Sequence, residues 1–257
     1  MDIIAAITSH RSIRRFTKDP VTEDLLTEIL DAGIRASSYG NMNPYSIVVS
    51  RDQETRERLF EPLKNQQMVL DAPVLLTFCA DFRRMRKWLR MNNAPDNFGD
   101  FSAFMIAAID VVLVAQNVAL AAEGRHLGIC YIGATLANTH LVGEVLELPP
   151  GVVAITSIVT GWPDEDPPLR DRLPLSGLVH RERYHDHTAD EVEQIYRDRN
   201  QAGWNRYMSN ARLREMVEAS DVENLAQLYT TLKYTPDAHE QQSASLLNYL
   251  REQGFLD

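Results

Sequence analysis

The segment from Phe101 to Ala122 constrains the fold most, because nearly all of its side chains are apolar. A stretch of this length has to be buried, either in a protein core or in a membrane. It carries Asp110, Gln116 and Asn117, and a carboxylate near the centre of a bilayer is costly. We therefore expect no membrane span, but a helix over about residues 103–123 that is buried on all sides in a protein core.

Shorter patterns predict the elements around this helix. Continuous apolar runs of strand length predict strands at 45–50, 73–80, 127–132 and 152–160. Helices are expected at 3–8, at 23–36 after Thr22 as N-cap, at 53–63, at 139–146 after Asn138 as N-cap, and through the charged tail at 189–255. The strands and helices do not alternate regularly, so an α+β fold is favoured over a doubly wound parallel sheet.

Composition and missing motifs exclude several functional classes. The 257 residues include 26 basic and 36 acidic side chains, and a net charge of −10 disfavours nucleic-acid binding. No two glycines are separated by one residue, so the dinucleotide-binding turn is absent, and P-loop and nucleophile-elbow motifs are absent as well. The two cysteines lie in apolar stretches, and an acid stands at position 2 with no basic leader. We expect a cytoplasmic protein with packed thiols.

Two arginine-rich segments indicate that an anion is bound. His10, Arg11, Ser12, Arg14 and Arg15 fall within six residues directly after the first helix. Guanidinium groups match the oxygens of a phosphate, although a solvated basic turn has the same composition. The second segment is the proline-flanked run 168–174, which contains Arg170 and Arg172 with Asp171 between them. Asp171 is expected to hold these two arginines oriented, and the two segments together predict a phosphate site.

The order of six motifs resembles the FMN-dependent nitroreductase family, and within it the NADPH-linked, oxygen-insensitive nitroreductases and flavin reductases. The motifs are HRSIRRF (10–16), RASSYGNMNPYSIVV (35–49), NQQMVLDAPVLLTFCADF (65–82), AQNVALAAEGRHLGICYIG (115–133), GWPDEDPPLRDRLP (161–174) and LVHRERY (178–184). The likeness covers about residues 3–184, and the tail resembles the family only as a helical extension.

The resemblance implies a set of flavin-binding residues. The first group, His10, Arg11, Ser12 and Arg14, resembles the wall around the FMN phosphate and ribityl chain, and Arg170 and Arg172 resemble the second phosphate segment. Gln66 matches a glutamine that hydrogen-bonds the flavin. Tyr131, Ile132 and Gly133 resemble the segment beside the isoalloxazine ring, and Ser37, Ser38 and Asn43 the loop that reaches the partner's flavin.

The resemblance also implies the architecture and the reaction. It implies a mainly antiparallel sheet flanked by helices, a core at 1–184, and a helical extension at 185–257 that embraces the partner in an intertwined homodimer. It implies a ping-pong enzyme that uses bound FMN, with NADPH or NADH as donor, to reduce nitroaromatics, quinones or free flavin. The cofactor carries this chemistry, so no catalytic side chain is required. The alternatives are a reductase of the same fold acting on halogenated or unsaturated compounds, and an FMN-binding storage or sensor protein.

Three further groups of side chains have both a functional and a structural interpretation. The basic run Arg83–Arg90, which contains Trp88, stands where the family has a variable lid; it could contact NADPH or substrate, or be a solvated helix. Four tail arginines could contact NADPH: Arg197, Arg199, Arg206 and Arg212. His180, His185 and His187 lack an accompanying metal-ligand spacing, so we expect no metal.

Overall fold

The computed structural model describes residues 3–257, so Met1 and Asp2, on which the reading of the N-terminus rests, lie outside it. The strands are β1 (Tyr45–Ser50), β2 (Val74–Asp81), β3 (Gly128–Ile132) and β4 (Val152–Gly161). The longer helices are α1 (Ile3–Thr8), α2 (Glu23–Gly33), α3 (Gln53–Phe60), α5 (Arg83–Met91), α6 (Phe101–Gly124), α8 (Thr139–Val145), α9 (Ala189–Met208), α10 (Ala211–Glu218) and α12 (Pro236–Glu252). Short helical turns are η1 (Tyr39–Asn41), α4 (Met68–Asp71), α7 (Ala134–Ala137), η2 (Leu175–Gly177), α11 (Leu225–Gln227) and η3 (Leu228–Lys233).

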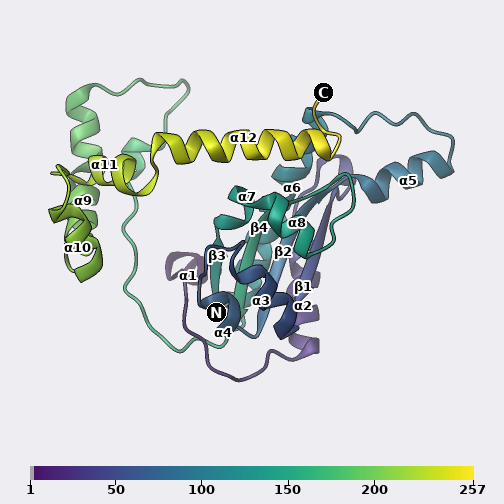
Figure 1. Ribbon diagram of the computed structural model, residues 1–257, viewed down its shortest axis with the longest axis horizontal. Helices are drawn as coiled ribbons and strands as arrows, with labels where there is room; N and C mark the ends of the chain where they lie inside the picture. The colour runs from purple at the N-terminus through teal and green to yellow at the C-terminus, as the bar shows by residue number, and fades with distance from the viewer. Residues whose placement is uncertain (1–2) are drawn as a thin grey trace. The chain divides into compact units, whose positions relative to one another are not determined.

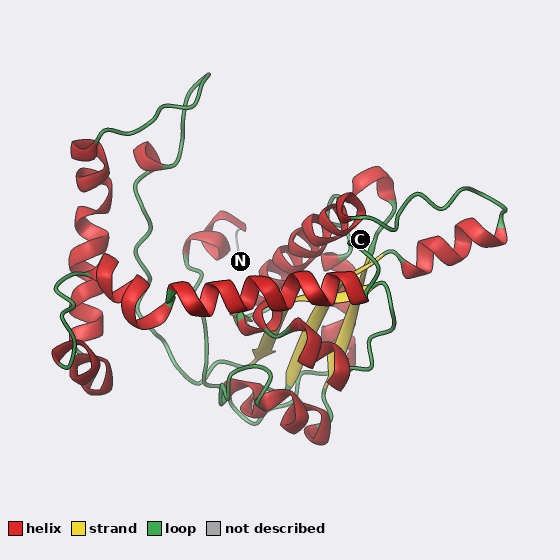
Figure 2. Ribbon diagram, turned by 45° about the horizontal axis from the view of Figure 1, so that its top comes forward, coloured by secondary structure: helices red, strands yellow, loops and turns green. Residues whose placement is uncertain are grey.

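The four strands form one antiparallel sheet, as the resemblance implies, in the order β1-β2-β4-β3. Alternate residues of β2 enter two different cores: Leu76 and Phe78 face α6, whereas Leu75 and Cys79 face α3, α4 and α8. Because helices cover both faces of the sheet, β2 is apolar throughout rather than alternating (Figure 1, Figure 2).

Helix α6 lies against the sheet, and within a single chain it is not buried on all sides. Its inward face packs on β2, β4 and α2, and Gly33 of α2 permits this contact, because a Cβ there would lie 2.2 Å from Val118. A second face, which carries Phe101, Met105, Ile109, Val112 and Leu113, is 42–53% exposed. The helix is long and apolar enough to cross a membrane, yet half of its most apolar window is buried within the chain, as in a core helix.

Local capping agrees with the sequence at one helix and differs at another. The Thr22 hydroxyl accepts a hydrogen bond from the Leu25 amide at 3.3 Å, as expected of an N-cap. The Asn138 side chain does not cap α8, but donates to the carbonyl oxygen of Pro62 at 2.6 Å. A long-range contact has therefore taken the place of the local cap predicted there.

The chain divides into two compact units, residues 1–169 with 242–257 and residues 170–241. The end of α12 belongs to the first unit, where Tyr249, Leu250 and Phe255 join the core beside α6. The second unit has a small core of its own, made by Tyr207, Val217, Val222, Leu225 and Leu228. The tail thus has core partners within the chain.

Candidate functional site

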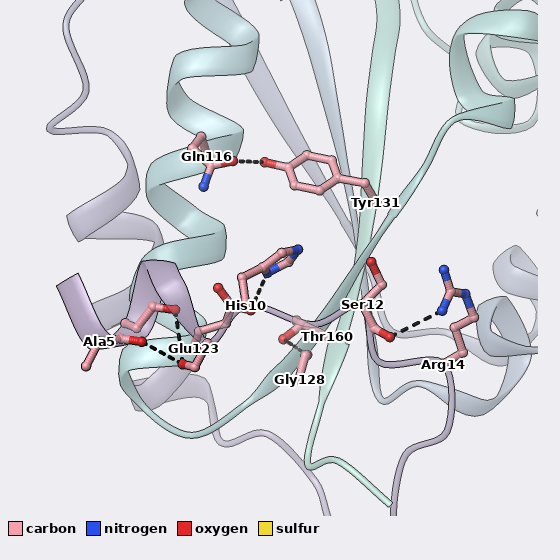
Figure 3. Close-up of polar contacts among 11 residues, drawn as sticks. Ala5, His10, Ser12, Arg14, Gln116, Glu123, Gly128, Tyr131 and Thr160 are labelled. Atoms are coloured by element: carbon pink, nitrogen blue, oxygen red, sulfur yellow. Dashed lines mark hydrogen bonds and ion pairs between the residues drawn. The ribbon is translucent and has the colours of Figure 1, made fainter. Parts of the chain in front are cut away.

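The basic N-terminal segment runs alongside β3. Ser12 forms a parallel bridge with Ile129, and the amide of Ile13 donates to the carbonyl oxygen of Ile129 at 2.8 Å. Gly128 makes this approach possible, because a Cβ at that position would lie 2.7 Å from the Cβ of Ile13. The segment therefore crosses from α6 to the far side of β3, with His10 nearest the helix and Arg14 beyond the strand (Figure 3).

Carboxylates that sequence reasoning missed lie against this segment. Nδ1 of His10 lies 2.6 Å from a carboxylate oxygen of Glu123, near the end of α6. Arg11 forms an ion pair with Asp166, and Glu165 accepts hydrogen bonds from the amides of Arg14 and Arg15. Glu123 could have been noticed as the acid that ends an apolar stretch, but its partner is 113 residues away in the sequence.

Arg14 differs from its neighbours because its guanidinium has no carboxylate partner among residues 3–257. The side chain is exposed, and Nη1 donates to the carbonyl oxygen of Ser12 at 3.3 Å. Most of its five N–H donors are therefore available to an anion. The Ser12 side chain is half-buried beside Arg14, next to the thiol of Cys130. Burial raises the pKa of that thiol, which makes it a packed group rather than a nucleophile.

The backbone at the end of β3 is exposed at Gly133. Gly133 is the N-cap of α7 with φ −65°, a conformation that any residue adopts, and a Cβ there would meet nothing within 4 Å. The conformation does not explain a glycine at this position, whereas the close approach of a flat ligand does. The residues present therefore fit a bound flavin at this edge. The Ile132 side chain is fully buried, so this residue can offer only its backbone.

Tyr131 lies between β3 and α6. Its hydroxyl donates to Oε1 of Gln116 at 3.4 Å (Figure 3). Burial, with a smaller contribution from the Glu123 carboxylate, raises the pKa of the Tyr131 phenol above its ordinary value. The group stays protonated at neutral pH, so it donates its hydrogen bond and holds no charge.

Asp110, a buried acid of α6, holds the loop Ser37–Asn43 in place by hydrogen bonds. Asp110, 2% exposed, accepts hydrogen bonds from the Ser38 hydroxyl at 2.6 Å and from the Tyr39 amide at 3.1 Å. The Ser38 hydroxyl in turn accepts from the Asn43 amide at 2.8 Å. Ser37 is exposed. Asp110, noted in the sequence only as an argument against a membrane, thus fixes the loop that carries three predicted site residues.

The structure does not bring this loop and His10 together within one chain. Asp110 and Glu123 are separated by 13 residues of one helix, which is about 20 Å at 1.5 Å per residue. Gln66 lies in the turn between α3 and α4, where its side chain donates to the carbonyl oxygen of Leu63 at 2.8 Å. The predicted residues therefore form separate groups, of which the cluster from His10 to Arg14 with Tyr131–Gly133 is contiguous.

Arg170 and Arg172 are exposed and belong to the second unit. The side chain of Arg172 donates to the backbone carbonyls of Arg170 and Asp171, at 3.3 and 3.1 Å. The carboxylate of Asp171 pairs with two arginines that the sequence does not link to it, Arg199 at 3.1 Å and Arg206 at 3.6 Å. Two of the four tail arginines are thus bound to Asp171.

Comparisons with known proteins settle the family. The model of the Nitroreductase family matches residues 7–162, which include the N-terminal segment, the loop and the end of β3. The chain belongs to the nitroreductase family. The resemblance seen in the sequence is therefore confirmed.

Relatives of this family member cover most of its length. The NADPH-flavin oxidoreductase of Vibrio harveyi is 36% identical over 211 residues, which span 82% of this chain and 85% of that protein. The oxygen-insensitive NADPH nitroreductase of Salmonella typhimurium is 34% identical over 182 residues, 70% and 74% of the two chains. A solved structure from Bacteroides fragilis is 40% identical with a TM-score of 0.90, and the match covers 98% of this chain and all of that one. The expected nitroreductase-like fold is thus confirmed.

Proposed function

We propose that this protein is an FMN-dependent oxidoreductase that uses NAD(P)H to reduce nitroaromatics, quinones or free flavin. The observation that carries the proposal is the guanidinium of Arg14, which lies beside Ser12 and has no carboxylate partner among residues 3–257, in a chain of the nitroreductase family. The names of the Vibrio harveyi and Salmonella typhimurium relatives support a flavin, NADPH and a nitro or flavin oxidant.

The side chains have distinct tasks in this proposal. Arg14 and Ser12 hold the phosphate end of FMN, and Arg11 adds positive charge. Glu123 fixes His10 through its 2.6 Å contact, and so sets the shape of the wall beside the flavin. When bound, FMN would supply the two-electron redox chemistry that links the nicotinamide donor to the oxidant. Gly133 keeps the approach to the ring clear.

A homodimer accounts for two features that a single chain leaves unexplained. The apolar face of α6 remains 42–53% exposed at five large side chains, more than a monomer usually presents in one contiguous row. The Ser37–Asn43 loop lies about 20 Å along α6 from His10, too far to join the same flavin within one chain. A second copy packed on α6 buries the row and brings its loop to the first copy's flavin. The extension at 185–257 also contacts the partner in this proposal. We further propose that the protein is cytoplasmic.

Helix α5 is positioned to influence the choice of oxidant. The guanidinium of Arg84 donates to the carbonyl oxygens of Asn43 and Tyr45, at 2.8 and 3.2 Å. These hydrogen bonds connect α5 to the end of the Ser37–Asn43 loop. Trp88 on the same helix is 60% exposed. An exposed aromatic side chain on an element tied to the site is available to stack on a flat substrate.

Steady-state kinetics test the proposal. With NADPH and a quinone or nitroaromatic varied against each other, the account predicts turnover by the FMN-loaded protein with parallel double-reciprocal lines. Turnover of halogenated or unsaturated compounds alone would move the assignment to the other reductases of this fold. Tightly bound FMN without turnover of any of these compounds would contradict the proposal and favour a storage or sensor protein.

A further inference from the structure

Outside the flavin site, the segment before α9 gathers three imidazoles and a carboxylate. His185 and His187 precede the helix, and Glu191 stands in its first turn. One possible ligand atom from each of these three residues lies within 4.8 Å of the other two. His180 joins them, with its ring centroid 5.3 Å from that of His187. All four residues belong to the second unit.

The pair formed by His185 and Glu191 has the spacing of two ligands on one ion. Nε2 of His185 lies 3.2 and 3.3 Å from the two carboxylate oxygens of Glu191. Zinc binds imidazole nitrogen and carboxylate oxygen at about 2.0–2.2 Å, so two ligands of a tetrahedral ion are about 3.3–3.5 Å apart. An ion can therefore replace the proton between these groups with little movement of either side chain.

His187 provides an independent observation. Its Nε2 atom is buried and has no hydrogen-bond partner in the described chain, which is uncommon for a buried polar atom. The ring lies edge-on to that of His185, with centroids 5.3 Å apart. A metal ion shared with His185 gives this nitrogen the partner that the protein itself does not supply.

Further hydrogen bonds fix the positions of the Glu191 carboxylate and of the loop that carries the histidines. Oε2 of Glu191 accepts from the amide of Thr188 at 2.8 Å and from its hydroxyl at 3.0 Å. Nδ1 of His180 accepts from the amide of His185 at 3.1 Å and holds the loop in place. Such supporting contacts are typical of metal sites.

We propose that His185, His187 and Glu191 bind a zinc ion, with water as the fourth ligand. Two histidines and a glutamate form a recognised zinc ligand set with an open position. The ion fastens the loop that follows η2 to the first turn of α9. The spacing of the three histidines in the sequence predicts no metal. Glu191, in the first turn of α9, supplies the ligand that this prediction left out. The proposal does not depend on the flavin.

Calorimetric titration of the full-length protein, stripped with a chelator, tests the site with Zn²⁺ as the probe. We expect one zinc ion per chain, a melting temperature that rises with Zn²⁺, and visible absorption bands of four-coordinate cobalt when Co²⁺ replaces it. His185→Gln and His187→Gln should each weaken zinc binding about tenfold or more. The matched control is His239→Gln, in the same unit but outside the cluster, which should bind zinc like the parent.

The variants change exposed or half-buried side chains, so circular dichroism and FMN content should match the parent. Absence of saturable zinc binding by the parent would overturn the proposal. Undiminished affinity in both histidine variants would overturn it as well. Because FMN content is recorded on the same samples, failure of the zinc site and failure of the flavin assignment are distinguishable.

Discussion

Replacing Arg14 with alanine should weaken FMN binding without harming the fold. The Arg14 side chain is exposed and forms one 3.3 Å hydrogen bond to a backbone carbonyl, so its loss should change the free energy of unfolding by less than about 0.5 kcal/mol. Hydrogen bonds from a guanidinium to a phosphate contribute about 1.5–3 kcal/mol. At 1.4 kcal/mol per factor of ten, we expect FMN affinity to fall roughly 10- to 150-fold.

Arg15→Ala is the matched control for this variant. It removes the same charge from the next residue, but the Arg15 side chain points to Glu165, with 3.4 Å between Nε and the carboxylate, and is 71% exposed. A surface pair of this kind contributes at most about 1 kcal/mol to stability. Because both variants alter the net charge equally, a difference between them isolates the contact made by Arg14.

The assay is the quenching of FMN fluorescence during titration with apoprotein, at fixed ionic strength. Thermal melting of both apoproteins verifies that the fold is kept. A dissociation constant for Arg14→Ala within about threefold of the parent would refute the assignment. Even a single neutral hydrogen bond contributes about 1 kcal/mol, which corresponds to roughly fivefold in affinity. An equal loss in Arg15→Ala would show that general electrostatic attraction, rather than contact, holds the phosphate.

Three other predictions follow from the structure. Gly133→Val should lower FMN occupancy in the purified protein while the melting temperature of the apoprotein stays the same, because Gly133 is exposed and a Cβ added there meets no atom within 4 Å. Asp110→Ala should lower the free energy of unfolding in urea by about 2–3 kcal/mol, since it removes the acceptor of two hydrogen bonds in a buried position, whereas Asp110→Asn, which keeps one acceptor oxygen, should cost less. Hydrogen bonds from Thr188 and His185 lower the pKa of Glu191 from 4.5 to about 2. The stabilising effect of the ionised carboxylate is therefore complete above about pH 4.5 and is lost as the pH falls toward 2. Melting curves of Glu191→Gln should show a weaker acid dependence over that range.

Features set by local pattern were predictable from the sequence. The four strands, the Thr22 cap and the long apolar helix follow from composition over short windows, and each is present within a few residues of its expected place. The antiparallel order of the sheet needed the family resemblance, because pairing depends on contacts far apart in the chain.

Features that depend on distant partners were not predictable. The arginines around Ser12 looked uniformly available, but Arg11 is paired with Asp166 and only contacts in three dimensions reveal it. The same holds for Asp171, whose carboxylate pairs with Arg199 and Arg206, about 30 residues further along the chain. The apolar face of α6 was expected to be buried because the pattern reports hydrophobicity, not which surface covers it.

An anaerobic absorbance spectrum of the purified protein, recorded before and after NADPH is added, tests the central claim most directly. The account predicts a yellow protein with about one FMN per chain, whose visible flavin absorbance bleaches when NADPH is added and returns when a quinone is supplied. A colourless protein that FMN cannot reconstitute, or bound flavin that NADPH and NADH both leave oxidised, would contradict it.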